Sequence, residues 1–299
     1  MEFGVHLTTA GANASRESIL EVAQEAERLS YESVWMFDHL FTPVAMDSTY
    51  PYSPDGSYHH SPDRPYFDCV AVMGALAAAT SSIRFGTLVM VPGYRHPVVL
   101  AKLLASIDAL AGGRMTLGVA GGWMEEEYEA VGLPAAQRLA RLDEHVALMR
   151  NAWQEGVTSF SGELYSHREA GFHPQPPQPG NTIPVIVGGH GDSALRRVAR
   201  WGDGWAVVAP GRELADDPVA AVGRRLEKLR SYCDEEGRSF EALLLVGQAP
   251  LDSPVGYFEV LAEAGVDTVD LRADLPKDVL IEAIRAFASD VMPRFAVGA

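Results

Sequence analysis

Along the chain, short runs of consecutive apolar residues alternate with longer segments in which apolar residues recur every three or four positions. The short runs are apolar on both faces, which is typical of parallel strands covered by helices on each side. We expect strands at residues 2–8, 32–37, 83–91, 114–120, 183–189, 204–209, 242–248 and 267–273. Between them we expect helices, among others at residues 15–30, 68–81, 97–113, 125–131, 138–154 and 276–291, the first of them with Ser15 as its N-cap.

Eight strand–helix units in 299 residues predict a (β/α)8 TIM barrel that forms a single domain over residues 1–299. An open doubly wound sheet is the alternative, but such sheets have fewer units and a clearer dinucleotide motif near their start. Two irregular regions, residues 41–67 and the stretch that ends with residues 173–182, are expected to follow strands. They would then be inserted loops on the C-terminal rim, where barrel active sites are built.

Composition narrows the class of partner. Hydrophobic residues make up 47% of the chain, which is enough for a sizeable core. The formal net charge of −16 argues against binding to nucleic acid or to anionic membrane surfaces. The N-terminus has no basic-then-apolar signal pattern, and no apolar run approaches the ~20 residues of a membrane span. Cys69 and Cys233 lie outside any motif. We therefore expect a soluble cytoplasmic protein with free thiols.

The stretch VIVGGHGDSALRRVARWGDGW, residues 185–205, is typical of an anion site. An apolar strand meets glycines and then an amphipathic helix, whose first backbone N–H groups can bind a negative charge. We expect a phosphate on Gly189, His190 and Gly191, with Arg212 from the next loop as a candidate counter-charge. The same residues also fit a dinucleotide motif, but the following strand ends in VVAPGRE without the acid that this motif needs. An ordinary tight turn is the remaining interpretation.

Asp38 and His39 leave the second predicted strand at the rim. A histidine beside an acid can exchange a proton near neutral pH, although Asp38 could equally cap a turn while His39 packs beneath the long loop. Neighbouring residues on an extended chain point apart, so the two side chains need not touch. Glu125, Glu126 and Glu127 begin a helix, where the helix dipole alone explains them. No metal-ligand spacing or G-x-S-x-G motif occurs, so we expect neither a metal site nor a serine hydrolase.

At these same segments the chain resembles the bacterial luciferase-like monooxygenase superfamily and, within it, the branch that uses the deazaflavin coenzyme F-420. The resemblance extends from Met1 to about Trp205. The segments that carry it are WMFDHL, YPYSPDG, IRFGTLVMVPGYRHPVVLAKLLASIDALAGGRMTLGVAGGW, the glutamate-rich helix start and PVIVGGHGDSALRRVARWGDGW.

The resemblance implies a (β/α)8 barrel, usually dimeric, with an inserted region after the fourth unit and a non-proline cis peptide at Leu88–Val89. It implies that His39 and Asp38 are catalytic, with His39 moving the proton. The residues implied to bind the coenzyme include those of the phosphate turn above. They are Asp38, Leu88, Val89, Val91, Gly121, Gly122, Glu126, Gly188, Gly189, His190, Gly191 and Arg212. The aromatic-rich loop 41–67 would be a substrate lid, and His6, Tyr66 and Trp123 would face the substrate.

The function implied by the resemblance is hydride transfer between coenzyme F-420 and a small organic substrate. A separate enzyme could reduce the coenzyme. One alternative is an FMN-dependent monooxygenase that uses reduced FMN and O2; another is a barrel that binds a flavin without turnover. A phosphate-binding lyase or isomerase would need a lysine or a set of carboxylates on strand ends, and lysines are missing there.

Overall fold

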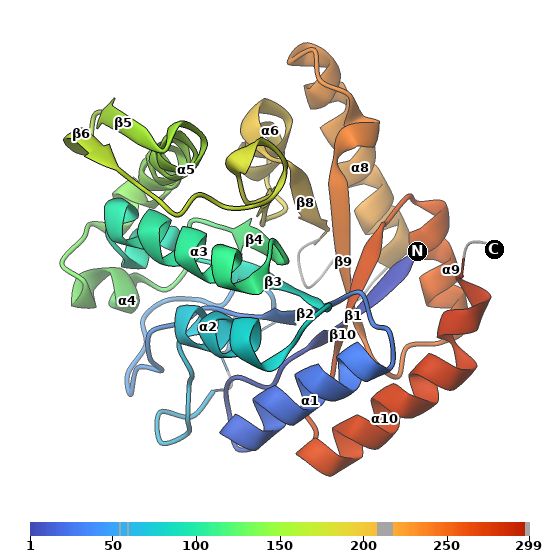
Figure 1. Ribbon diagram of the computed structural model, residues 1–299. Coiled ribbons are helices and arrows are strands. Elements are labelled where there is room, and N and C mark those ends of the chain that lie inside the picture. The colour runs from blue at the N-terminus through green and yellow to red at the C-terminus, as the bar shows by residue number, and fades with distance from the viewer. Residues whose placement is uncertain (54, 59, 208–217, 297–299) are drawn as a thin grey trace.

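The computed structural model describes residues 1–53, 55–58, 60–207 and 218–296. Within them, eight parallel strands close into a barrel in the order β1-β10-β9-β8-β7-β4-β3-β2 (Figure 1). The strands are β1 (Glu2–His6), β2 (Ser33–Met36), β3 (Arg84–Met90), β4 (Met115–Val119), β7 (Val185–Val187), β8 (Gly204–Val207), β9 (Leu244–Pro250) and β10 (Thr268–Arg272). The predicted (β/α)8 barrel is confirmed.

Helices cover the outside of the barrel (Figure 1). They are α1 (Arg16–Arg28), α2 (Cys69–Ala79), α3 (Pro97–Ala111), α4 (Glu125–Ala130), α5 (Arg138–Glu155), α6 (Asp192–Trp201), α8 (Pro218–Glu235), α9 (Val255–Glu263) and α10 (Lys277–Asp290). Ser15 begins α1, as its residue type predicts, and its hydroxyl accepts the backbone N–H of Ser18 at 3.0 Å. No helix among the described residues is long and apolar enough to cross a membrane.

A single indole fills the middle of the barrel. Trp35 of β2 packs there with Leu88, Ile186, Ala206 and Val246, which come from four other strands. Glycines on both neighbouring strands make the space: a Cβ on Gly4 would lie 2.7 Å from Trp35 Nε1, and one on Gly86 would lie 2.8 Å from Trp35 Cζ3. Side chains alternate along a strand, so this layer also shows which residues of each strand face inward.

The two inserted regions differ in their position along the chain. Residues 41–67 follow β2, as expected, and therefore lie at the C-terminal ends of the strands. The second region begins after α5 and precedes β7, so the expectation that it follows a strand is wrong. It is also not wholly irregular, because it contains an antiparallel hairpin of β5 (Val157–Ser161) and β6 (Ser166–Gly171), seen beside α5 in Figure 1.

Candidate functional site

Asp38 and His39, just past β2, point in different directions, as expected for neighbours on an extended chain. The Asp38 carboxylate is buried and accepts the backbone N–H of Val91 at 3.0 Å. Arg95 donates to both of its oxygens, at 2.7 and 2.9 Å. Burial opposes the charge on Arg95, but the hydrogen bonds and charge of Asp38 outweigh it and raise the pKa of the guanidinium. Asp38 thus joins β2 to the segment that follows β3.

His39 is oriented by a carboxylate that the sequence analysis did not single out. Its Nδ1 lies 2.8 Å from Oε2 of Glu127, whose side chain is fully buried in the first turn of α4. The Tyr94 hydroxyl donates to the same oxygen at 2.7 Å, and the backbone N–H of Leu40 donates to the other. With Nδ1 engaged, Nε2 is the nitrogen of His39 that can exchange a proton with a ligand.

Glu126, the predicted coenzyme ligand on α4, contacts the long loop. Its carboxylate accepts the backbone N–H of Asp47 at 2.7 Å and that of Ser48 at 3.1 Å, and the Ser48 hydroxyl donates at 2.7 Å. Burial opposes the ionised form, yet these donors lower the pKa of Glu126. The role of Glu126 as a coenzyme ligand stays a prediction. Its hydrogen bonds to Asp47 and Ser48 hold the long loop to α4.

Aromatic rings of the long loop and of the turn between β4 and α4 surround His39. The ring centroids of Tyr58, Tyr66 and Trp123 lie 5.4, 5.5 and 5.8 Å from the imidazole. Tyr52 reaches the other side of the site, where its ring lies 6.0 Å from that of His190. Burial raises the pKa of Tyr52, Tyr58 and Tyr66, so these phenols stay protonated. The loop therefore spans the distance between His39 and the glycine turn.

The glycine turn that follows β7 is shaped by close contacts. Gly188 faces Val89, and a Cβ on Gly188 would lie 2.7 Å from a Val89 methyl carbon. Gly189 has a φ of +107° and its carbonyl accepts the indole N–H of Trp205 at 2.9 Å. Gly191 is the N-cap residue of α6 and has no side chain that could bond the first backbone N–H groups of this helix. Such an end can accept an anion.

Leu88–Val89 is a cis peptide bond, so that prediction is confirmed. Gly121 and Gly122 form the turn between β4 and α4; Gly122 has a φ of +71° and borders Val91. Arg212, the predicted counter-charge for phosphate, lies outside the described residues. A cation that sequence reasoning missed approaches the glycine turn from α8, where Arg225 Nε donates to the carbonyl of His190 at 3.3 Å.

His6 lies at the end of β1, where its Nδ1 is 2.8 Å from Oδ2 of the buried Asp270. Its ring packs against Phe37, with centroids 4.1 Å apart. The roles predicted for His6, Tyr66 and Trp123 toward a substrate stay predictions. Among the residues that the structure describes, no three histidine, cysteine or acidic side chains are grouped to hold a metal ion.

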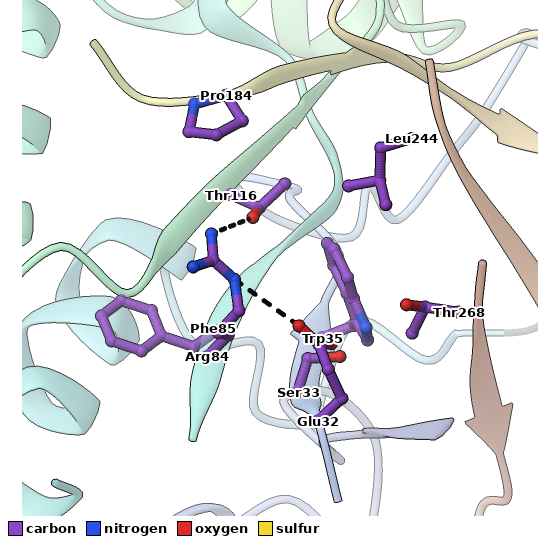
Figure 2. A pocket seen from close by; sticks show the side chains of 9 residues that line it. All are labelled: Glu32, Ser33, Trp35, Arg84, Phe85, Thr116, Pro184, Leu244 and Thr268. Carbon is purple, nitrogen blue, oxygen red and sulfur yellow. Dashed lines mark hydrogen bonds and ion pairs between the residues drawn. The ribbon is translucent and has the colours of Figure 1, made fainter. Parts of the chain in front are cut away.

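A cavity of about 240 Å³ lies at the opposite end of the barrel from these residues. It is lined by the first residues of several strands, including Ser33, Leu244 and Thr268, and by Trp35 (Figure 2). Figure 2 shows the Arg84 guanidinium between Glu32 and Thr116. It donates to the Thr116 hydroxyl at 3.0 Å. This cavity is therefore separate from the candidate site on the C-terminal rim.

The fold and the rim together define an α/β barrel with a carboxylate-backed histidine and a glycine turn that can accept an anion. The family model for luciferase-like monooxygenases matches residues 1–251. The chain belongs to this family.

Two relatives show what the chain is similar to in sequence. The chain is 36% identical to an uncharacterized protein of Mycobacterium tuberculosis over 209 residues, 70% of this chain and 71% of the relative. It is 34% identical over 202 residues to an F420-dependent glucose-6-phosphate dehydrogenase of Beutenbergia cavernae, covering 60% of this chain and 59% of that one.

Three solved structures share the fold. Monooxygenase RslO1 from Streptomyces bottropensis has a TM-score of 0.75 at 21% identity, covering 99% of this chain and 100% of that one. The coenzyme F420-dependent tetrahydromethanopterin reductase from Methanopyrus kandleri has a TM-score of 0.73 at 17% identity, covering 98% and 99%. The oxygenating constituent of 3,6-diketocamphane monooxygenase from Pseudomonas putida, in complex with FMN, has a TM-score of 0.70 at 14% identity, covering 98% of each chain.

Proposed function

We propose that the protein is an oxidoreductase that transfers a hydride between coenzyme F-420 and a small organic substrate. The observation that carries this proposal is the pairing of His39 with the buried Glu127 on the same rim as the glycine turn that begins α6. The relative from Beutenbergia cavernae, which is named for F420 dependence, supports the deazaflavin as the coenzyme.

The residues on the rim fit a coenzyme with a phosphate-bearing tail. When bound, the deazaflavin would supply a two-electron hydride carrier. Gly188 to Gly191 would hold the phosphate through backbone N–H groups, and the Leu88–Val89 segment would support the ring. His39 Nε2 would give or take the proton that accompanies the hydride. Asp38 would position the end of β3 through Val91 and Arg95, and the aromatic loop would exclude water.

The second candidate is an FMN-dependent monooxygenase that works with a separate reductase. It is favoured by the FMN-bound diketocamphane monooxygenase component, whose fold this chain shares. Both flavins carry a phosphate, so the glycine turn suits either.

Titration of the purified protein with coenzyme F-420 and, in parallel, with FMN distinguishes the two candidates. We expect low-micromolar binding of F-420, followed by its fluorescence, and little binding of FMN. Gly188→Val should weaken F-420 binding at least tenfold, because its side chain would collide with Val89, whereas Gly74→Val on α2, where an added Cβ meets nothing within 4 Å, should not. Tight FMN binding instead would assign the oxygen-using function, and binding of neither would refute both.

We also propose that the protein is a single-domain cytoplasmic homodimer. The exposed apolar side chains of Val99, Leu103 and Leu110 recur along α3 at helical spacing and offer a surface for a second copy. Sedimentation equilibrium tests the homodimer, and the mass of a monomer at micromolar concentration would contradict it.

A further inference from the structure

A polar layer lies inside the barrel just above the apolar layer around Trp35. Gly4 faces the interior, since its missing side chain is replaced by Trp35, and strand alternation puts His6 on the same face. On β10, Asp270 lies two positions after Thr268, and on β9, Gln248 lies two positions after Val246. Thr268 and Val246 face the interior, so Asp270 and Gln248 face it as well. His6 Nδ1 lies 2.8 Å from Asp270 Oδ2, and Gln248 Nε2 donates to the same oxygen at 3.2 Å.

Two atoms of this layer have no hydrogen-bond partner among the described residues. They are Nε2 of His6 and Oδ1 of Asp270. His6 is 8% exposed and Asp270 is fully buried, so water does not bathe either group. Leaving buried polar atoms unpaired is energetically unfavourable. Unpaired polar atoms at the C-terminal end of a barrel interior, where ligands bind, indicate a site that a ligand completes.

The pairing with Asp270 decides what kind of ligand atom His6 can accept. In the neutral imidazole whose Nδ1–H donates a hydrogen bond to the Asp270 carboxylate, Nε2 keeps its lone pair and accepts a hydrogen bond. We propose that His6 Nε2 binds a hydroxyl or N–H group of the substrate, separate from the group that reacts at His39. The substrate class is therefore a molecule with at least two polar groups, one of them a hydrogen-bond donor.

The position of His6 supports two contacts on one substrate. Its ring packs on Phe37, which lies two residues before His39 on the same chain segment. His6 thus lies deeper in the barrel than His39, and a substrate that reaches both must extend inward past Phe37. Because the Phe37 ring packs against the His6 imidazole, such a substrate would displace the Phe37 ring.

The hydrogen-bonding character of His6 can be measured without knowing the substrate. We would record 15N-histidine NMR spectra with and without coenzyme F-420, assigning His6 by the signal lost in His6→Gln. At pH 8 we expect a proton on Nδ1 and none on Nε2. The matched probes are 2-propanol, which donates a hydrogen bond, and acetone, which does not; only 2-propanol should shift the Nε2 signal. Asp270→Leu removes the acceptor at Nδ1, so there acetone should shift it too.

A proton on Nε2 in the wild type, or equal responses to the two probes, would overturn the proposal. This result does not depend on coenzyme binding, so it separates failure at His6 from failure of the proposed function, on which the substrate assignment rests. Once turnover of a hydroxylated substrate is found, His6→Gln should raise its KM at least tenfold. In that variant kcat should stay within threefold and F-420 affinity should not change. His173→Gln, at an exposed histidine outside the site, is the control. An unchanged KM in His6→Gln would also refute the assignment.

Discussion

At the scale of single residues, the site depends on which of three adjacent glutamates reaches the histidine. Glu125, Glu126 and Glu127 are equivalent as acids at a helix start. Successive side chains on a helix point about 100° apart, so each meets a different neighbour. Glu127 contacts His39, Glu126 contacts Ser48, and Glu125 is exposed. The sequence could identify His39 but not its partner, because the two lie 88 positions apart and only the placement of α4 brings them together.

His39→Ala should lose about 10²-fold or more in turnover, because a positioned acid–base group contributes that much. Glu127→Gln should lose turnover as well, since the amide cannot stabilise a protonated imidazole as the carboxylate does. F-420 affinity should stay within threefold in both variants. Steady-state kinetics with any substrate found in a screen gives the comparison, with Glu125→Gln as the control on the same helix. Turnover near the wild-type value in His39→Ala would remove this histidine from the mechanism.

At the scale of elements, local capping was predictable and loop structure was not. Ser15 at the start of α1 was expected from its type and position. The hairpin of β5 and β6 was missed because its strands are largely exposed and carry no apolar run. Another contact invisible in the sequence joins α1 to the turn before β3. Glu27 accepts the backbone N–H groups of Ser81, Ser82 and Ile83 at 2.7, 2.5 and 3.0 Å.

These donors outweigh burial, which opposes the charge, and lower the pKa of Glu27 to about 2 from an ordinary 4.5. A carboxyl whose pKa is lowered on folding stabilises the protein above its unfolded pKa and loses this effect as pH falls. Glu27→Gln should therefore reduce the free energy of unfolding by about 1–2 kcal/mol at pH 7. The difference from wild type should shrink between pH 4.5 and 2. Urea unfolding across this range, with the exposed Glu282→Gln as control, measures it; a pH-independent difference would contradict the account.

At the scale of the whole molecule, one indole organises the barrel interior. Trp35 is almost fully buried and contacts residues of four strands. Trp35→Ala would leave a cavity at the centre and should cost about 3–5 kcal/mol. Trp123→Ala, in the partly exposed aromatic cluster, should cost clearly less. Urea unfolding midpoints compare the two, and equal losses would show that the barrel does not depend on its central side chain.

The sequence by itself determined what depends on neighbouring residues: eight apolar strands between helices, the Ser15 cap and the glycine turn that begins α6. The cis bond at Leu88–Val89 was available through family resemblance. Tertiary structure alone decided the pairings His39–Glu127, Asp38–Arg95 and His6–Asp270, the last across 264 positions. The physical reason is that periodicity sets which face a side chain occupies, while closure of the barrel decides what faces it.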